Sequence, residues 1–312
     1  MGLAAGDALG AAVEFMSLAD IKNKYGGDGI QDFDAWNGFE VGSYTDDTQM
    51  ALATAMGCIK AAECWKKEGI FDPIPHVYNE YLSWLGTQND PFQRRSPGNT
   101  CLSALGSGQM GTMDAPINNS KGCGGVMRVA PVGLVFLGEM AFLEGAKTAA
   151  ITHGHASGYL SAGFLAELVS HIVNGKRLQE AIRLSKETLK TFTDHQETLM
   201  SVNLAENLAK KAVPVLEAIQ QIGEGWVGEE ALAIAIYCSL EFSDDFRSAV
   251  TASVNHSGDS DSTGAITGAV MGALLGDNAI PERWISRLEN SQKISEIADE
   301  IYRIFKEQPS DF

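Results

Sequence analysis

The 312-residue sequence predicts an all-α protein folded as one compact domain over residues 1–312. Apolar residues recur every three or four positions in most segments, which is the spacing of one face of an α-helix. No segment alternates apolar and polar residues convincingly enough to indicate a strand. Glycine-rich stretches separate the helical segments, and none resembles a long flexible linker between domains.

In chain order, the helical pattern covers residues 50–65, 77–85, 159–173, 178–192, 229–240 and 283–305. Glycine-rich turns are expected between them, at residues 24–47, 94–100, 118–126 and 222–230. Two more helices are indicated by glycines at every fourth position, namely Gly2, Gly6 and Gly10, and Gly264, Gly268, Gly272 and Gly276. Glycines at this spacing share one helical face and let a second backbone approach closely. We therefore expect tight packing of these two helices.

The composition, with 45% hydrophobic and 20% charged residues, is that of an ordinary globular protein. A formal charge of −17 repels nucleic acids and anionic membranes, so neither is an expected partner. A small anion such as a nucleotide stays possible, because backbone N–H groups can hold a phosphate. The five cysteines are scattered and predict neither disulfides nor a zinc site. With no basic segment typical of a signal peptide, we expect a cytoplasmic protein.

Two acidic clusters stand at the starts of small-residue helices. One contains Asp259, Asp261 and Ser262, and the other contains Thr45, Asp46, Asp47 and Thr48. Helix capping explains one such residue in each cluster, because Asp, Ser and Thr are good N-caps. Four carboxylates with hydroxyls and no neighbouring Lys or Arg also favour divalent cations of the magnesium, manganese or calcium type. If the two helix starts face each other, the clusters form a two-metal centre able to activate water.

Six motifs, taken in order, resemble the ADP-ribosylglycohydrolase family: "GLAAGDALGAAVE", "YTDDTQMALA", "SPGNTCLSAL", "SKGCGGVMRVAPVGL", "THGHA" and "GDSDSTGAITGAVMGALLG". The resemblance covers nearly the whole chain. It implies an all-α, orthogonal multi-helix bundle whose central cleft holds two divalent cations, Mg²⁺ or Mn²⁺. It also implies a metal-dependent glycosidase acting on an N- or O-glycosyl bond of ADP-ribose.

The resemblance assigns metal ligands position by position. They are Thr45, Asp46, Asp47, Asp259, Asp261 and Ser262, with Ser262 standing where relatives often have threonine. The metals would hold the two hydroxyls of the distal ribose, beside the anomeric carbon. Glu14 matches a glutamate on a mobile loop near the scissile bond, and Glu14 or the metal-bound Asp259 would handle the proton. Asp7 is expected to be structural and to bond to backbone near the metal site.

The resemblance also assigns substrate contacts. The segment Ser120, Lys121, Gly122, Cys123 and Gly124 matches a phosphate-binding loop, in which many relatives have asparagine at the position of Cys123. His153 matches a histidine that contacts substrate, whereas His155 does not. Gly98 and Asn99 match a loop beside the bound ribose. Arg128 is expected to serve structure.

We therefore predict hydrolysis of the bond between ADP-ribose and a modified side chain of a protein, or of a small ADP-ribose conjugate. Arginine is the first expectation, and serine- or acetyl-linked ADP-ribose is the alternative within the same chemistry. A second class is an immunity or binding protein that neutralises an ADP-ribosyltransferase toxin by docking on it. A third is a two-metal phosphoesterase, which would release AMP rather than ADP-ribose.

Overall fold

The computed structural model describes residues 1–69, 71–211 and 213–305. Within these ranges the regular structure is helical, without a β-sheet, which confirms the all-α prediction. The last residues of the predicted domain, 306–312, lie outside the described residues. Up to residue 150 the helices are α1 (Gly2–Gly10), α2 (Leu18–Tyr25), α3 (Asp46–Glu68), α4 (Pro73–Thr87), α5 (Asn99–Gly106), η1 (Cys123–Gly125), α6 (Ala130–Val135) and α7 (Glu139–Ala150).

The remaining helices are α8 (Ala156–Val173), α9 (Leu178–Leu189), α10 (Gln196–Ala209), α11 (Val215–Ile222), α12 (Gly228–Glu241), α13 (Phe246–Val254), α14 (Ser260–Leu275), η2 (Asp277–Ala279), α15 (Glu282–Ile285) and α16 (Ser291–Phe305). Among the described residues, no helix combines the length and apolarity that crossing a membrane requires.

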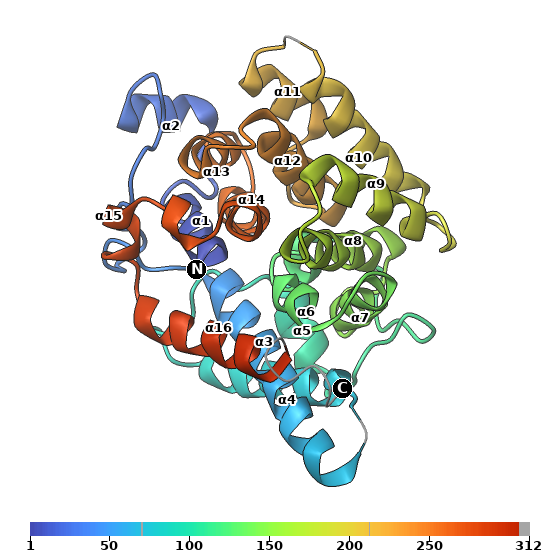
Figure 1. Ribbon diagram of the computed structural model, residues 1–312. Helices are drawn as coiled ribbons and strands as arrows, with labels where there is room; N and C mark the ends of the chain where they lie inside the picture. The colour runs from blue at the N-terminus through green and yellow to red at the C-terminus, as the bar shows by residue number, and fades with distance from the viewer. Residues whose placement is uncertain (70, 212, 306–312) are drawn as a thin grey trace.

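Helix α14 occupies the centre of the molecule. It packs against α1, α12, α13 and α8, and Figure 1 shows α1 directly beside it. Residues 260–268 of this helix are all buried. Small residues therefore occupy all of its sides, whereas a surface helix has a single apolar face. The starts of α14 and α3, which carry the two acidic clusters, are therefore placed by the core of the protein.

The two glycine-spaced helices, each predicted to pack tightly, pack against each other as α1 and α14. A Cβ atom added at Gly6 would collide with the backbone carbonyl of Gly264, and one at Gly10 would collide with that of Ser260. The two backbones therefore touch, as the four-residue spacing predicts. This contact brings the end of α1 against the start of α14.

The predicted helix over residues 283–305 is wrong in one respect, because the chain forms two helices with a turn between them. Asn290 has a φ of 54° and so leaves the right-handed helical region. The Glu289 backbone N–H donates to the Gly42 carbonyl, while the Glu289 carboxylate pairs with Arg95. These tertiary contacts outweigh a local pattern that reads as continuous helix.

A buried carboxylate away from the acidic clusters predicts a pH-dependent stability. Burial raises the pKa of Glu167 on α8 to about 7. Between about pH 4.5 and 7, Glu167 keeps its proton in the folded protein but loses it in the unfolded chain. The free energy of unfolding therefore falls as pH rises through this range. The free energy of unfolding is measured by chemical denaturation with excess Mg²⁺. Glu167→Gln should reduce the fall in this free energy between pH 5 and 8 by about 2 kcal/mol. An unchanged pH profile in this variant would contradict the assignment.

Candidate active site

The two acidic clusters begin neighbouring helices, and capping explains only part of them. Thr45 is the N-cap of α3, and its hydroxyl accepts a hydrogen bond from the Asp47 N–H at 3.2 Å. Asp259 occupies the N-cap position of α14, yet its carboxylate makes no capping hydrogen bond. Asp261 accepts from the adjacent Ser262 N–H at 2.9 Å. The side chains of Asp46, Asp47 and Asp259 therefore need another explanation.

Asp7 connects α1, which packs on α14, to the start of α3. One carboxylate oxygen accepts from the Thr45 N–H at 2.9 Å, and the other accepts from the Thr48 N–H at 2.9 Å and the Thr48 hydroxyl at 2.5 Å. A carboxylate at a helix N-terminus is stabilised by such N–H groups. The prediction that Asp7 is structural is confirmed, and α1 fixes the start of α3 as well as that of α14.

Five carboxyl groups then gather at the starts of α3 and α14, those of the four aspartates buried and that of Glu14 half-buried. One oxygen from each of Glu14, Asp259 and Asp261 lies within 4.8 Å of the other two. Burial, and then the charge of the nearby Asp261, raises the pKa of Asp46 and of Asp47. The four aspartates are at most 4% exposed. The structure thus brings together the carboxylates of both predicted clusters and Glu14.

This set of side chains suits divalent cations. Burial, then repulsion from Asp261, Asp259 and Asp46, raises the pKa of Glu14 to about 12. Asp47 Oδ2 is buried and has no hydrogen-bond partner. Among the described residues, no ion pair neutralises the five carboxylates. Buried carboxylates need a proton or a cation, and an all-oxygen set fits Mg²⁺ or Mn²⁺.

Cys123 lies at the edge of the carboxylate cluster. Its thiol donates to Asp259 Oδ2 at 2.7 Å and lies 3.5 Å from the Ser262 hydroxyl. Burial and the charge of Asp259 raise the pKa of the Cys123 thiol well above its ordinary value. A raised thiol pKa disfavours a nucleophilic role.

The loop predicted to bind phosphate packs against His153. A Cβ atom added at Gly122 would lie 3.4 Å from His153 Nε2, and Gly124 is closer still to the ring. Burial and then the Arg128 charge lower the pKa of His153 to about 3, so the imidazole is neutral. Its Nδ1 shares a 2.8 Å hydrogen bond with the Thr152 hydroxyl. His155 is the N-cap of α8, where its Nδ1 accepts from the Ser157 N–H at 3.1 Å.

The charge of Lys121 is directed to protein carboxylates. Its ammonium group contacts Glu197 at 2.6 Å and Glu229 at 2.5 Å. Phosphate binding by this loop would therefore use backbone N–H groups rather than a free ammonium. Arg128 is fully buried, with its guanidinium 4.3 Å from the Tyr81 ring centroid and its Nη2 donating to Thr152 at 2.7 Å, as its predicted structural role requires.

Gly98 and Asn99 stand at the start of α5 and are both exposed. The next residue, Thr100, has its hydroxyl 3.1 Å from the Ser120 hydroxyl. The α5 start and the phosphate-loop candidate are therefore adjacent, as the two predicted substrate segments require.

An aromatic pair beside Glu14 was not among the predicted site residues. Phe15 and Trp226 stack with ring centroids 5.4 Å apart, and their side chains are 68% and 38% exposed. Phe15 has a φ of 67°, which is uncommon for a bulky residue. The Trp226 carbonyl accepts from the Cys123 N–H, so this pair belongs to the same site. A tryptophan between glycines in segment 222–230 was the available signal.

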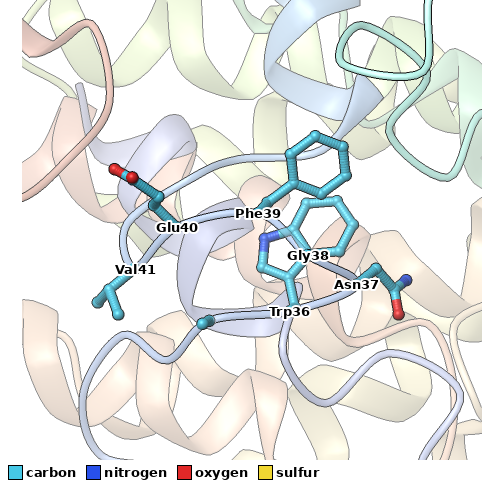
Figure 2. A pocket seen from close by; sticks show the side chains of 7 residues that line it. Trp36, Asn37, Gly38, Phe39, Glu40 and Val41 are labelled. Atoms are coloured by element: carbon cyan, nitrogen blue, oxygen red, sulfur yellow. The ribbon is translucent and has the colours of Figure 1, made fainter.

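A separate hollow of about 660 Å³ is lined by residues 35–41. Figure 2 shows the loop that forms it, with the rings of Trp36 and Phe39 against each other and Glu40 turned away from them. The two ring centroids are 4.7 Å apart. None of the candidate site residues lines this hollow, so it is distinct from the acidic site.

Comparisons with known proteins agree with the geometry. The chain is 29% identical to the ADP-ribosyl-[dinitrogen reductase] glycohydrolase of Rhodospirillum rubrum, over 93% of this chain and 88% of the relative. It is 24% identical to the ADP-ribosylarginine hydrolase Tri1 of Pseudomonas putida, over 97% and 76% of the two chains.

A match to the ADP-ribosylhydrolase ARH3 of Mus musculus has 26% identity and covers 60% of this chain and 58% of the relative. A solved structure titled "ADP-ribosylglycohydrolase-related protein complex" superposes with a TM-score of 0.69 at 25% identity, covering 97% of this chain and 95% of that one. The family model for ADP-ribosylglycohydrolase matches residues 1–311. The chain therefore belongs to the ADP-ribosylglycohydrolase family.

Proposed function

We propose that this protein is a metal-dependent hydrolase that releases ADP-ribose from modified arginine side chains, with residues 1–312 as one catalytic domain. The observation that carries the proposal is the cluster of four buried aspartates, Asp46, Asp47, Asp259 and Asp261, with the half-buried Glu14. The cluster has an unpartnered oxygen and no cationic partner among the described residues. Thr45, Ser262 and the four aspartates would hold the ions. When bound, these ions supply electrostatic stabilisation and an acidic water.

The chain's own residues would orient the substrate and move the proton. In the loop from Ser120 to Gly124, the N–H groups of Ser120, Gly122 and Cys123 already donate within the protein. The N–H groups of Lys121 and Gly124 are therefore the ones that would meet the diphosphate, beside the neutral His153. One carboxylate oxygen of Glu14 lies within 4.8 Å of a carboxylate oxygen of Asp259 and of Asp261. This position suits proton transfer at the scissile bond. The likeness to the ADP-ribosylarginine hydrolase Tri1 of Pseudomonas putida supports arginine over serine or acetyl as the linkage.

The proposal is tested by the choice of substrate and by chelation. Arginine-, serine- and acetyl-linked ADP-ribose would be incubated with the protein, with and without EDTA, and the products separated chromatographically. We expect ADP-ribose from the arginine conjugate, loss of release in EDTA, and recovery on adding Mg²⁺ or Mn²⁺. Release of AMP would identify a phosphoesterase instead. A binding-only immunity role lacks support, since the three named relatives above are all hydrolases.

Glu14→Gln should lower kcat about 10²- to 10⁴-fold, the usual contribution of a general acid or base. The amide keeps the size of the side chain but cannot exchange the proton. Mg²⁺ affinity, measured by calorimetry, should fall much less than kcat, because the aspartates hold the ions. A kcat near that of the unmodified protein would remove Glu14 from the mechanism.

A further inference from the structure

Sulfur flanks the oxygen cluster on the side of α14. The Cys123 thiol is 2.7 Å from Asp259 Oδ2 and 3.5 Å from the Ser262 hydroxyl, which in turn lies 3.8 Å from Met127 Sδ. Both Asp259 and Ser262 are proposed metal ligands. The candidate centre of this chain therefore carries a soft donor that a set of Asp, Thr and Ser ligands lacks.

The backbone holds this thiol in place. The Cys123 N–H donates to the Trp226 carbonyl at 3.2 Å, and the Cys123 carbonyl accepts from the N–H groups of Val126 and Met127. Gly122 pairs with Val227 in a short bridge. Three separate backbone contacts thus position Cys123 against Asp259, independently of any ion.

The sulfur lies within reach of both proposed ligands. A sulfur at ~2.3 Å and an oxygen at ~2.1 Å from one tetrahedral ion lie ~3.6 Å apart. The 3.5 Å separation between Cys123 Sγ and the Ser262 hydroxyl matches this value, whereas the 2.7 Å contact with Asp259 is a hydrogen bond that the thiol donates. A second observation points to a ligand, because Asp47 is 2% exposed and its Oδ2 has no hydrogen-bond partner.

We propose that Cys123 is a sulfur ligand that lets this centre bind thiophilic divalent ions, such as Co²⁺, Zn²⁺ and Cd²⁺, together with Asp259 and Ser262. The inference rests on the metal centre of the proposed function. As the sulfur–metal bond forms, the thiol proton passes to solvent, and no oxidation or reduction occurs. Mg²⁺ has little affinity for sulfur and stays with the oxygen ligands. Thiophilic ions therefore compete with Mg²⁺ at a site that Cys123 makes selective for them.

The test uses the metal-free, full-length protein and Co²⁺ as a spectroscopic probe. Titration with Co²⁺ should produce a sulfur-to-metal charge-transfer absorption in the near ultraviolet that saturates. Cys123→Ser and Cys123→Asn should both lack this absorption and bind Cd²⁺ at least about tenfold more weakly. Both should keep their Mg²⁺ affinity in calorimetry. Thermal unfolding of each variant establishes that it is folded.

Cys64→Ser on α3 is the matched control and should keep the absorption. An absorption of equal strength in the Cys123 variants would assign the sulfur to another residue and overturn the inference. Mg²⁺ binding without any Co²⁺–sulfur absorption would overturn it as well, while leaving the proposed function intact. Binding of neither ion would instead refute the metal centre on which both proposals depend.

Discussion

Asp261→Asn should lower turnover of an arginine-linked ADP-ribosyl substrate about 10³-fold or more, a loss at the upper end of those seen when one electrostatic group is removed from a catalytic site. Asp261 is the electrostatic centre of the cluster. Burial first, and then the charge of Asp261, raises the pKa of Asp7, Glu14, Asp46 and Asp47. If Asp261 is a metal ligand, as proposed, the amide would bind the ions more weakly, and the loss of turnover should persist at saturating substrate.

The same variant should be more stable than the unmodified protein in EDTA at pH 8. Without divalent ions, the clustered carboxylates repel one another in a buried volume, and an amide of the same size relieves that repulsion. Differential scanning calorimetry with and without Mg²⁺ measures the change. The exposed Asp244→Asn is the control and should alter neither activity nor Tm. Normal turnover in Asp261→Asn, or a lower Tm in EDTA, would refute the role given to Asp261.

The helical fold was predictable because its signals are local. The periodic segments lie on α3, α4, α8, α9 and α12, within a few residues of their observed ends. The break near residue 290 was not predictable, since it depends on Glu289 meeting Arg95 and the Gly42 carbonyl, which are distant in sequence. Short helices such as α2 and α13 were missed because eight or nine residues carry too little periodicity.

The candidate site also combines features that the sequence predicts locally with contacts that depend on the tertiary fold. The sequence places carboxylates at two helix starts, and the glycine spacing indicates a close helix contact that could unite them. The contact of Cys123 with Asp259 spans 136 positions of sequence and had no local signal. The stacking of Phe15 on Trp226 likewise depends on how loops fold over the cluster. Residues that act through tertiary contact alone lie beyond what periodicity and spacing predict.

Gly6→Ala should destabilise the protein by about 3 kcal/mol or more, at the upper end of overpacking costs, because the new methyl group would collide with the Gly264 carbonyl. The backbone cannot yield without moving α1 away from α14. Asp7 lies on α1 and accepts from the N–H groups of Thr45 and Thr48 at the start of α3. A shift of α1 would therefore also move the proposed ligands on α3. We expect a lower Tm together with weaker Mg²⁺ binding, measured by calorimetry.

Gly272→Ala is the matched control because it lies on the same glycine face, two turns beyond Gly264. A Cβ atom there would lie 3.4 Å from the Gly2 Cα, which is ordinary van der Waals contact. Alanine is favoured over glycine inside a helix by about 1 kcal/mol, so this variant should keep or raise the Tm. Equal effects of the two substitutions would show that glycine contributes only flexibility. A loss confined to Gly6→Ala would show that backbone contact between α1 and α14 is what assembles the metal site.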